Sequence, residues 1–211
     1  MGRLRIKGVV NVTSAFLFLI SGAIWLTTII AVPLFALWAH FDDLMSVAGM
    51  GFSRLMHNFM VLMGYLYAPW QNRIHMPDFP DSAAAATHFA DVQHLFILNL
   101  IVLVITIYPA LRFIRRLMRE HKMYTLRTPA IWGILVPLAL GAAMAVNFDA
   151  VFIGFHKLLF RNSDWLFDPN LDPIINVLPE GYFAASFVIA LLLFMGCLAW
   201  VLKRGRDDAR N

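Results

Sequence analysis

The hydrophobic positions of this chain fall into four long runs that are separated by more polar segments. The runs cover residues 9–39, 92–114, 130–148 and 182–202. Each run is long enough to cross a lipid bilayer, since a crossing helix needs roughly 17 to 25 largely apolar residues. In lipid the backbone polar groups must be satisfied within each segment, which favours helices over open sheets. The pattern therefore predicts an all-α protein with four transmembrane helices.

Two of the connecting segments are long and partly apolar. Residues 40–91 contain the stretch Phe52–Trp70, whose apolar positions are interrupted by polar ones, as is typical of a helix lying in the membrane interface. The second connection, residues 149–181, includes most of a second amphipathic stretch, Phe148–Phe160. This stretch is too short to span a bilayer. We expect these connections to form an extracytoplasmic cap of short interfacial helices and loops on a four-helix bundle. The whole chain, residues 1–211, is expected to be a single integral membrane domain.

Composition and charge place the chain in a membrane and predict its orientation. Charged residues make up 14% and the mean hydropathy is +0.70, whereas a soluble domain has about 25% charged residues. Thirteen of the seventeen Lys and Arg residues lie in the two chain ends or in the segment from Arg112 to Arg127, which begins at the end of the second run and precedes the third. Because basic residues are retained on the cytoplasmic side, both termini are predicted to be cytoplasmic. The basic excess is then a signal of topology and gives no reason to expect nucleic-acid binding.

Several classes of chemistry lack their sequence signatures. Cys197 is the only cysteine, which excludes an internal disulfide and a thiol-pair oxidoreductase. The chain has no HExxH or cysteine–histidine cluster for zinc, no GxSxG for a serine hydrolase, and neither GxxxxGK nor GxGxxG for nucleotides. We therefore expect neither a metal nor a cofactor.

Two histidines near the outer segments are the candidate chemical groups. His88 and Asp91 are three residues apart and share a helix face, and a carboxylate beside an imidazole can fix its tautomer and raise its basicity. The alternative is an ordinary helix start, with Asp91 favoured by the N-terminal dipole. His156 shares a face with Asp149 two turns earlier, so both could border one pocket. The alternative there is an interfacial histidine that reaches water.

Four stretches carry a family resemblance, in order along the chain. They are "NFMVLMGYL" (58–66), "FPDSAAAATHFADVQHLF" (79–96), "NFDAVFIGFHKLLFRNSDWLFDP" (147–169) and "DPIINVLPEGYF" (172–183). Together they resemble the lipoprotein intramolecular transacylase (Lit) family of small four-helix bacterial membrane proteins. The resemblance implies a cofactor-independent acyltransferase in the bacterial plasma membrane, active at the extracytoplasmic face on diacylated lipoproteins. Its reaction would move the sn-2 acyl chain of the diacylglyceryl-cysteine to the α-amino group of that cysteine, giving an N-acyl lyso-form lipoprotein. It further implies His88 and His156 as the catalytic residues.

The chemistry of an O-to-N acyl transfer suits two histidines. The attacking α-amino group has an ordinary pKa of about 7.7 to 8.0 and must lose a proton, which an imidazole can accept. The leaving glyceryl oxygen needs a proton in return, and the sequence leaves open which histidine is base and which is acid. Supporting or substrate-binding residues are expected to be Asp91, Asp149, Asn147, Arg161, Asn162, Trp165 and Ser82. The expected partners are diacylated lipoproteins and membrane lipid, and the expected state is a monomer.

Three other functions remain open from the sequence. A haem- or quinone-binding four-helix protein would need facing histidines inside the bundle, but only His94 lies within a predicted span. A non-catalytic membrane chaperone or adaptor would tolerate replacement of His88 and His156. A lipid or peptide hydrolase would release a free product in place of an internally transferred acyl chain.

Overall fold

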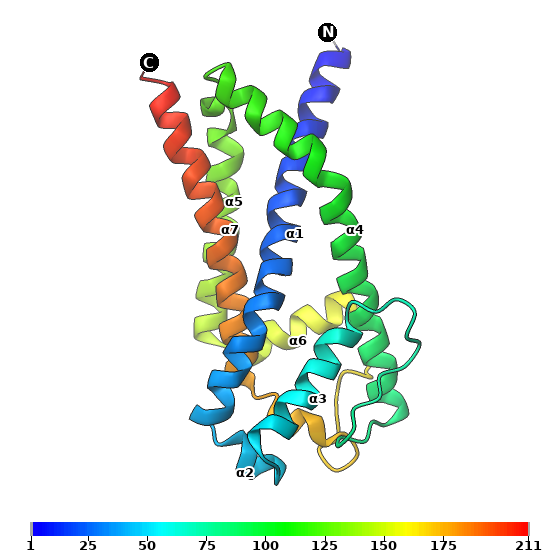
Figure 1. Cartoon of the computed structure of the whole chain (residues 1–211). Coiled ribbons are helices and arrows are strands. Elements are labelled where there is room, and N and C mark those ends of the chain that lie inside the picture. Colours follow the sequence, from blue (N-terminus) through cyan, green and yellow to red (C-terminus); the bar gives the residue numbers. More distant parts are fainter. Residues whose placement is uncertain (1, 211) are drawn as a thin grey trace. The chain divides into compact units, whose positions relative to one another are not determined.

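The computed structural model describes residues 2–210, with side chains from residue 8 to residue 210, and the regular elements in this range are all helices (Figure 1). The elements are α1 (Gly2–Phe41), α2 (Leu44–Ala48), α3 (Phe52–Tyr65), α4 (Ala83–Arg119), η1 (Met123–Leu126), α5 (Arg127–Val146), α6 (Phe148–Leu159), η2 (Pro173–Val177) and α7 (Glu180–Asp208). The predicted all-α class is confirmed. The basic side chains of Arg3, Arg5 and Lys7, on which part of the orientation prediction rests, lie outside the described side chains.

Four segments of the described chain are long and apolar enough to cross a membrane: Gly8–Phe41, Ala83–Arg119, Met123–Val146 and Glu180–Asp208. The four predicted spans are therefore confirmed, and the protein is a multi-pass membrane protein. The helices extend beyond the apolar runs because an apolar run marks only the part of a helix suited to lipid. The third run was predicted to continue to residue 148, but α5 ends at Val146 and the next helix begins at Phe148.

The chain divides into two compact units. Unit 1 comprises residues 1–26, 99–146 and 188–211, and unit 2 comprises residues 27–98 and 147–187. Helices α1, α4 and α7 contribute residues to both units. The expectation that residues 1–211 form one domain stays a prediction.

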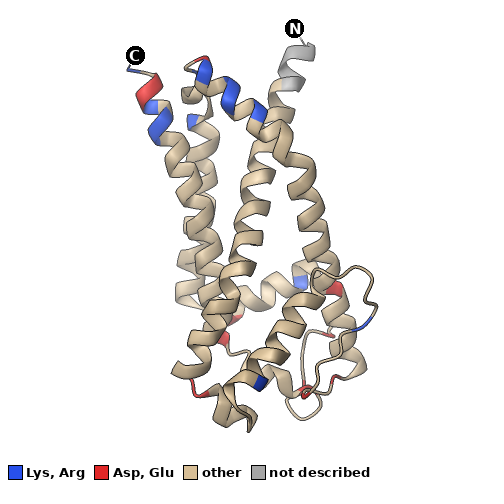
Figure 2. Cartoon of the chain, in the orientation of Figure 1, with Lys and Arg blue, Asp and Glu red and all other residues tan. Residues whose placement is uncertain are grey.

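Unit 1 is held together by apolar contacts among its helices, one of them at a glycine of α5. Its buried side chains include Leu117, Met123 and Leu198. At Gly133 of α5, a Cβ atom would lie 2.6 Å from the Leu198 side chain and 2.8 Å from the Phe16 ring. With a larger residue at position 133 the ends of the Leu198 and Phe16 side chains would have to shift, so glycine suits this contact of α5 with α1 and α7. Lys and Arg residues of unit 1 gather at the C-terminal parts of α4 and α7 and at the start of α5 (Figure 2).

Unit 2 has an aromatic core formed by residues of α1, α3 and α7. The rings of Phe35 and Phe59 stack with centroids 3.9 Å apart, and Tyr182 meets Phe35 edge-on at 5.6 Å. The Tyr182 hydroxyl donates a hydrogen bond to the Ala31 carbonyl at 3.2 Å, so this buried polar group is satisfied. Phe89 of α4 packs into the same cluster. The core thus anchors the beginning of α4, where the candidate histidine of that helix lies.

Candidate active site

A buried cap fixes where α4 begins. The Ser82 Oγ accepts a hydrogen bond from the Ala85 N–H at 3.1 Å, as serine does at a helix N-cap. The carboxylate of Asp172, which is only 2% exposed, accepts from the Ser82 N–H at 2.7 Å and from its Oγ–H at 3.0 Å. The Ser82 hydroxyl is therefore committed to this cap, and α4 starts early enough to carry His88 in its second turn.

Helix α6 begins at an asparagine cap and ends near the second candidate histidine. The Asn147 side-chain oxygen accepts from the Ala150 N–H at 2.9 Å. His156 lies in the last turn, on the buried face of an otherwise largely exposed helix. Asn147, which was predicted as a supporting or substrate-binding residue, uses its side-chain oxygen as the N-cap of α6.

The structure brings His88 and His156 together within unit 2. Their ring centroids are 5.7 Å apart and each residue is 8% exposed. Aromatic rings surround the pair: Phe160 lies 4.8 Å from His88 and 5.6 Å from His156, and Phe167 lies 5.6 Å from His88. These apolar walls restrict the access of water, and they face two groups that can each carry a proton.

The hydrogen bonds of the two imidazoles differ. The Nδ1 of His156 is 2.8 Å from the Phe152 carbonyl oxygen, four residues earlier in α6. A carbonyl oxygen can only accept, so Nδ1 carries the hydrogen and the neutral ring presents the lone pair of Nε2. The Nδ1 of His88 is buried and has no hydrogen-bond partner among the described residues. One ring is therefore fixed in its tautomer by its own helix, and the other is not.

Burial also affects the charge of His156. Removal of the ring from water lowers the pKa of His156 below its usual value of 6.5, and the hydrogen bond to the Phe152 carbonyl opposes part of this shift. The ring is therefore neutral, and able to accept a proton, at pH values where an exposed histidine would begin to be charged.

The other predicted residues divide into those near the pair and those away from it. Asn162 Nδ2 donates to Asp91 Oδ2 at 3.0 Å, and Trp165 packs on His156 with centroids 4.9 Å apart. Arg161 lines a pocket with Asp91 and Asn162. Asp149 is exposed in the first turn of α6 and makes no ion pair or side-chain hydrogen bond within residues 8–210.

Sequence reasoning missed the aromatic surroundings and the buried carboxylate of Asp172. Phe152, His156 and Phe160 recur every fourth residue, which is the spacing of one helix face and could have indicated the aromatic wall. Nothing near Asp172 in the sequence indicated its partner, because Ser82 is 90 positions away. Over the described part of the chain, no group of three or more His, Cys, Asp or Glu residues is arranged to hold a metal ion.

Comparisons with known proteins agree with this geometry. The family described as "Lipoprotein intramolecular transacylase Lit" matches residues 9–183. A structure of the membrane-integral lipoprotein intramolecular transacylase Lit from Bacillus cereus is similar with a TM-score of 0.86 and 28% identity, covering 100% of this chain and 98% of that one. A structure of that enzyme with one histidine replaced by arginine has a TM-score of 0.74, 29% identity and coverage of 100% and 97%. Another, with a histidine replaced by alanine, has a TM-score of 0.77, 28% identity and coverage of 99% and 95%. No curated protein sequence gives a significant match.

The fold, the buried imidazole pair and these matches define the class of protein as a membrane-integral acyltransferase. The match extends over most of the chain, from the first apolar run to the start of α7. The chain belongs to the lipoprotein intramolecular transacylase family, Lit.

Proposed function

We propose that this protein moves the sn-2 acyl chain of a lipoprotein's diacylglyceryl-cysteine to the α-amino group of the same cysteine, with His88 and His156 transferring the protons. The observation that carries the proposal is the 5.7 Å approach of two buried imidazoles inside a family of intramolecular transacylases. Both reacting groups belong to one substrate molecule, so the enzyme needs to orient them and move a proton.

His156 is assigned as the base. Its Nδ1–H is bound to the Phe152 carbonyl, which leaves Nε2 to accept a proton. The bound α-ammonium group first releases one proton to water. The neutral α-amine that results attacks the ester carbonyl carbon, the new C–N bond forms, and the nitrogen gives one further proton to Nε2 of His156. The bond between the acyl carbon and the sn-2 oxygen then breaks, and that oxygen takes up one proton through the His88–His156 pair. One proton moves from nitrogen to oxygen, so the reaction balances without another reactant.

The aromatic walls favour transfer over hydrolysis. Phe160 and Phe167 cover His88, while Phe152 and Trp165 cover His156, with centroid distances from 4.1 to 5.6 Å. Water that reached the acyl carbon would compete with the amine for attack. Aromatic side chains that keep water from the proton-transfer groups therefore support acyl transfer to the amine and argue against hydrolysis of the ester.

The reaction is placed at the extracytoplasmic face of the bacterial plasma membrane, with both termini in the cytoplasm. This placement is supported by the concentration of basic residues in the segments that form unit 1. The protein is proposed to act as a monomer, without metal or cofactor, on diacylated lipoproteins within the membrane.

The test is single replacement of each histidine. His88→Ala and His156→Ala are produced in a bacterial host that lacks lipoprotein N-acylation, and lipopeptides are analysed by mass spectrometry. General acid–base groups contribute about 10²- to 10⁴-fold, so each variant should lose at least about 100-fold in lyso-form product. His94→Ala is the matched control, because this histidine lies on the same helix but is exposed. All variants are first checked for a folded protein by size-exclusion chromatography and thermal unfolding. Undiminished lyso-form product from a folded His88 or His156 variant would remove that residue from the proposal.

A further inference from the structure

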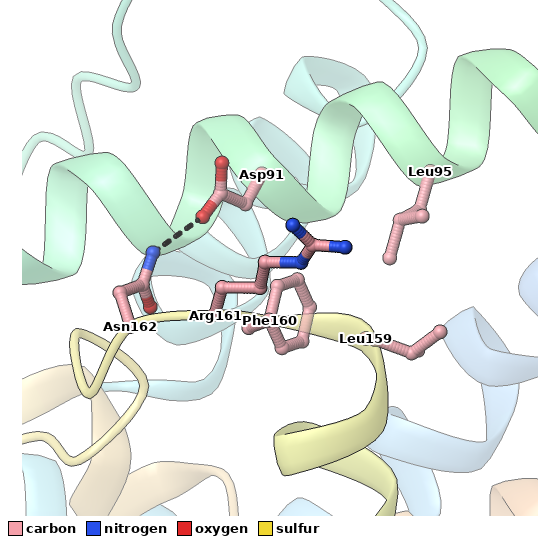
Figure 3. A pocket seen from close by; sticks show the side chains of 6 residues that line it. All are labelled: Asp91, Leu95, Leu159, Phe160, Arg161 and Asn162. Carbon is pink, nitrogen blue, oxygen red and sulfur yellow. Dashed lines mark hydrogen bonds between the residues drawn. The ribbon is translucent and has the colours of Figure 1, made fainter.

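A pocket of about 340 Å³ lies beside the histidine pair, within unit 2. It is lined by Asp91, Leu95, Leu159, Phe160, Arg161 and Asn162 (Figure 3). Phe160 lines the pocket and also contacts the histidine pair, since the centroid of its ring lies 4.8 Å from that of His88. A molecule bound in this pocket is thus separated from the proton-transfer groups by the width of one side chain.

The pocket holds groups of both charges. In Figure 3 Asp91 and Asn162 lie together at one end, and the Arg161 guanidinium lies in the middle of the pocket, between Asp91 and Leu95. One carboxylate oxygen of Asp91 accepts from Asn162 at 3.0 Å, whereas its other oxygen has no hydrogen bond to any described residue. Arg161 makes no ion pair or side-chain hydrogen bond with residues 8–210. One acceptor and several guanidinium donors are therefore available to a ligand.

The other end of the pocket is apolar. Leu95 and Leu159 lie away from the carboxylate, with Phe160 between the two ends (Figure 3). A ligand that fits must carry a cation and a nearby acceptor at one end and hydrocarbon at the other. The first residue of a diacylated lipoprotein has this order: an α-ammonium group, a peptide carbonyl two bonds away, and a thioether-linked glyceryl group with its chains.

We propose that this pocket binds the N-terminal aminoacyl group of the lipoprotein, with Asp91 accepting a hydrogen bond from the α-ammonium group and Arg161 donating to the first peptide carbonyl. The assignment rests on the proposed function and names how its substrate is recognised. Asn162 holds the Asp91 carboxylate in place. Acylation converts the ammonium group into a neutral amide, which loses the charged interaction with Asp91. The product is therefore released more easily than the substrate.

The test measures binding separately from reaction. The ligand is a fluorescent lipopeptide whose two chains are joined to glycerol by ether bonds, so that no acyl group can be transferred. Its partner ligand is identical but has hydrogen in place of the α-amino group. The full chain is studied in lipid nanodiscs as wild type, Asp91→Asn and Asp42→Asn. Asn at position 91 can still accept from Asn162, and Asp42 is a carboxylate outside the pocket that accepts from Trp38 Nε1.

The wild type and Asp42→Asn should bind the amine ligand about tenfold or more tightly than the ligand without the amine, as expected for a charge-assisted hydrogen bond. Asp91→Asn should lose this preference. Arg161→Gln should weaken both ligands alike, because both contain the carbonyl. Equal binding of the two ligands by the wild type, or an unchanged preference in Asp91→Asn, overturns the assignment.

A second measurement separates this inference from the proposed reaction. The same proteins are given the ester lipopeptide, and the transferred chain is followed by mass spectrometry. If the wild type transfers the chain but Asp91→Asn keeps its preference for the amine ligand, the reaction stands and the binding assignment fails. If the preference depends on Asp91 but no chain is transferred, the binding assignment stands and the proposed reaction fails.

Discussion

His156 is the side chain whose chemical state the structure defines most closely. Its Nδ1 is held by the Phe152 carbonyl at 2.8 Å, and the rings of Phe152 and Trp165 lie 4.1 and 4.9 Å from its own. Burial lowers the pKa of His156 from 6.5. A base acts in its neutral form, so the loss of activity that is caused by protonation of His156 should occur as the pH falls through this lowered pKa. The acid limb of kcat/KM that belongs to His156 is therefore expected below pH 6.5, separate from the decline below about pH 8 that belongs to the substrate's α-amino group.

Removal of the Trp165 indole beside His156 should shift the acid limb of kcat/KM that belongs to His156. Trp165→Ala admits water to the imidazole, which raises the pKa of His156 toward its usual value and moves the acid limb of kcat/KM to higher pH. Trp165→Phe keeps an aromatic cover and should leave the limb nearly unchanged. The measurement is kcat/KM for an ester lipopeptide between pH 4.5 and 8, values chosen to bracket the ordinary histidine range. Identical limbs in wild type and Trp165→Ala would mean that Trp165 does not control the ring's access to water.

Residue types in the sequence could indicate candidate groups but could not decide between their uses. Asn147 and Ser82 were predicted as supporting or substrate-binding residues, and in the structure both side chains cap helices. Asparagine and serine are common at helix N-caps, so the signal was present, yet the same side chains are also common in active sites. The closeness of His88 and His156 followed from the family resemblance. It could not follow from spacing alone, because the two residues lie on different helices.

At the scale of elements, the link between Ser82 and Asp172 joins the start of α4 to the segment around η2. The carboxylate satisfies both donors of Ser82, and the Ser82 oxygen in turn satisfies the Ala85 N–H. Because Asp172 is almost fully buried, water cannot replace it as the acceptor.

Replacement of Asp172 should destabilise unit 2. Asp172→Ala leaves the Ser82 N–H without its acceptor, and charged hydrogen bonds of this kind contribute roughly 1.5 to 3 kcal/mol to the free energy of unfolding. Asp172→Asn keeps one acceptor oxygen and should lower the free energy of unfolding by less than Asp172→Ala does. Thermal unfolding in detergent gives the comparison, and the double variant with Ser82→Ala should fall short of the sum of the single effects. Strictly additive losses would show that the two residues act independently.

Helix positions were predicted better than helix lengths. The apolar run began at residue 92, whereas α4 begins at Ala83, because the alanine-rich turn before the run favours helix without being suited to lipid. Helix α2, with five residues, is too short to show a periodic pattern. The loop after α3 depends on a distant pair: Asn58, which is fully buried, donates to Asp78 Oδ2 at 2.7 Å and accepts from the Asp78 N–H at 3.0 Å. No local signal identifies that pairing.

At the scale of the whole molecule, charge follows the division into units. The segments of unit 1 contain thirteen of the seventeen Lys and Arg residues, and the segments of unit 2 contain ten of the thirteen Asp and Glu residues. Positive residues are retained in the cytoplasm during insertion. The loop between α4 and α5 is therefore expected inside the cell, and the loop after α6 outside it.

Cysteine labelling can test this orientation. Cys197 is the only cysteine, so Cys197→Ala gives a background without thiols. In that background, Ser163→Cys and Thr125→Cys each introduce one exposed thiol. A membrane-impermeant maleimide added to intact cells should label the cysteine at position 163 and spare the one at 125, and permeabilised cells should show labelling at both. Labelling of position 125 in intact cells would reverse the predicted orientation.

The hydrogen bonds between Ser82 and Asp172 also affect the order in which the protein folds during translation. Its two ends are 90 positions apart, and translation proceeds from the N-terminus. While residues beyond α6 are still being made, α4 lacks the carboxylate that completes its cap. The start of α4 is therefore expected to be less stable in the nascent chain until residue 172 has been made.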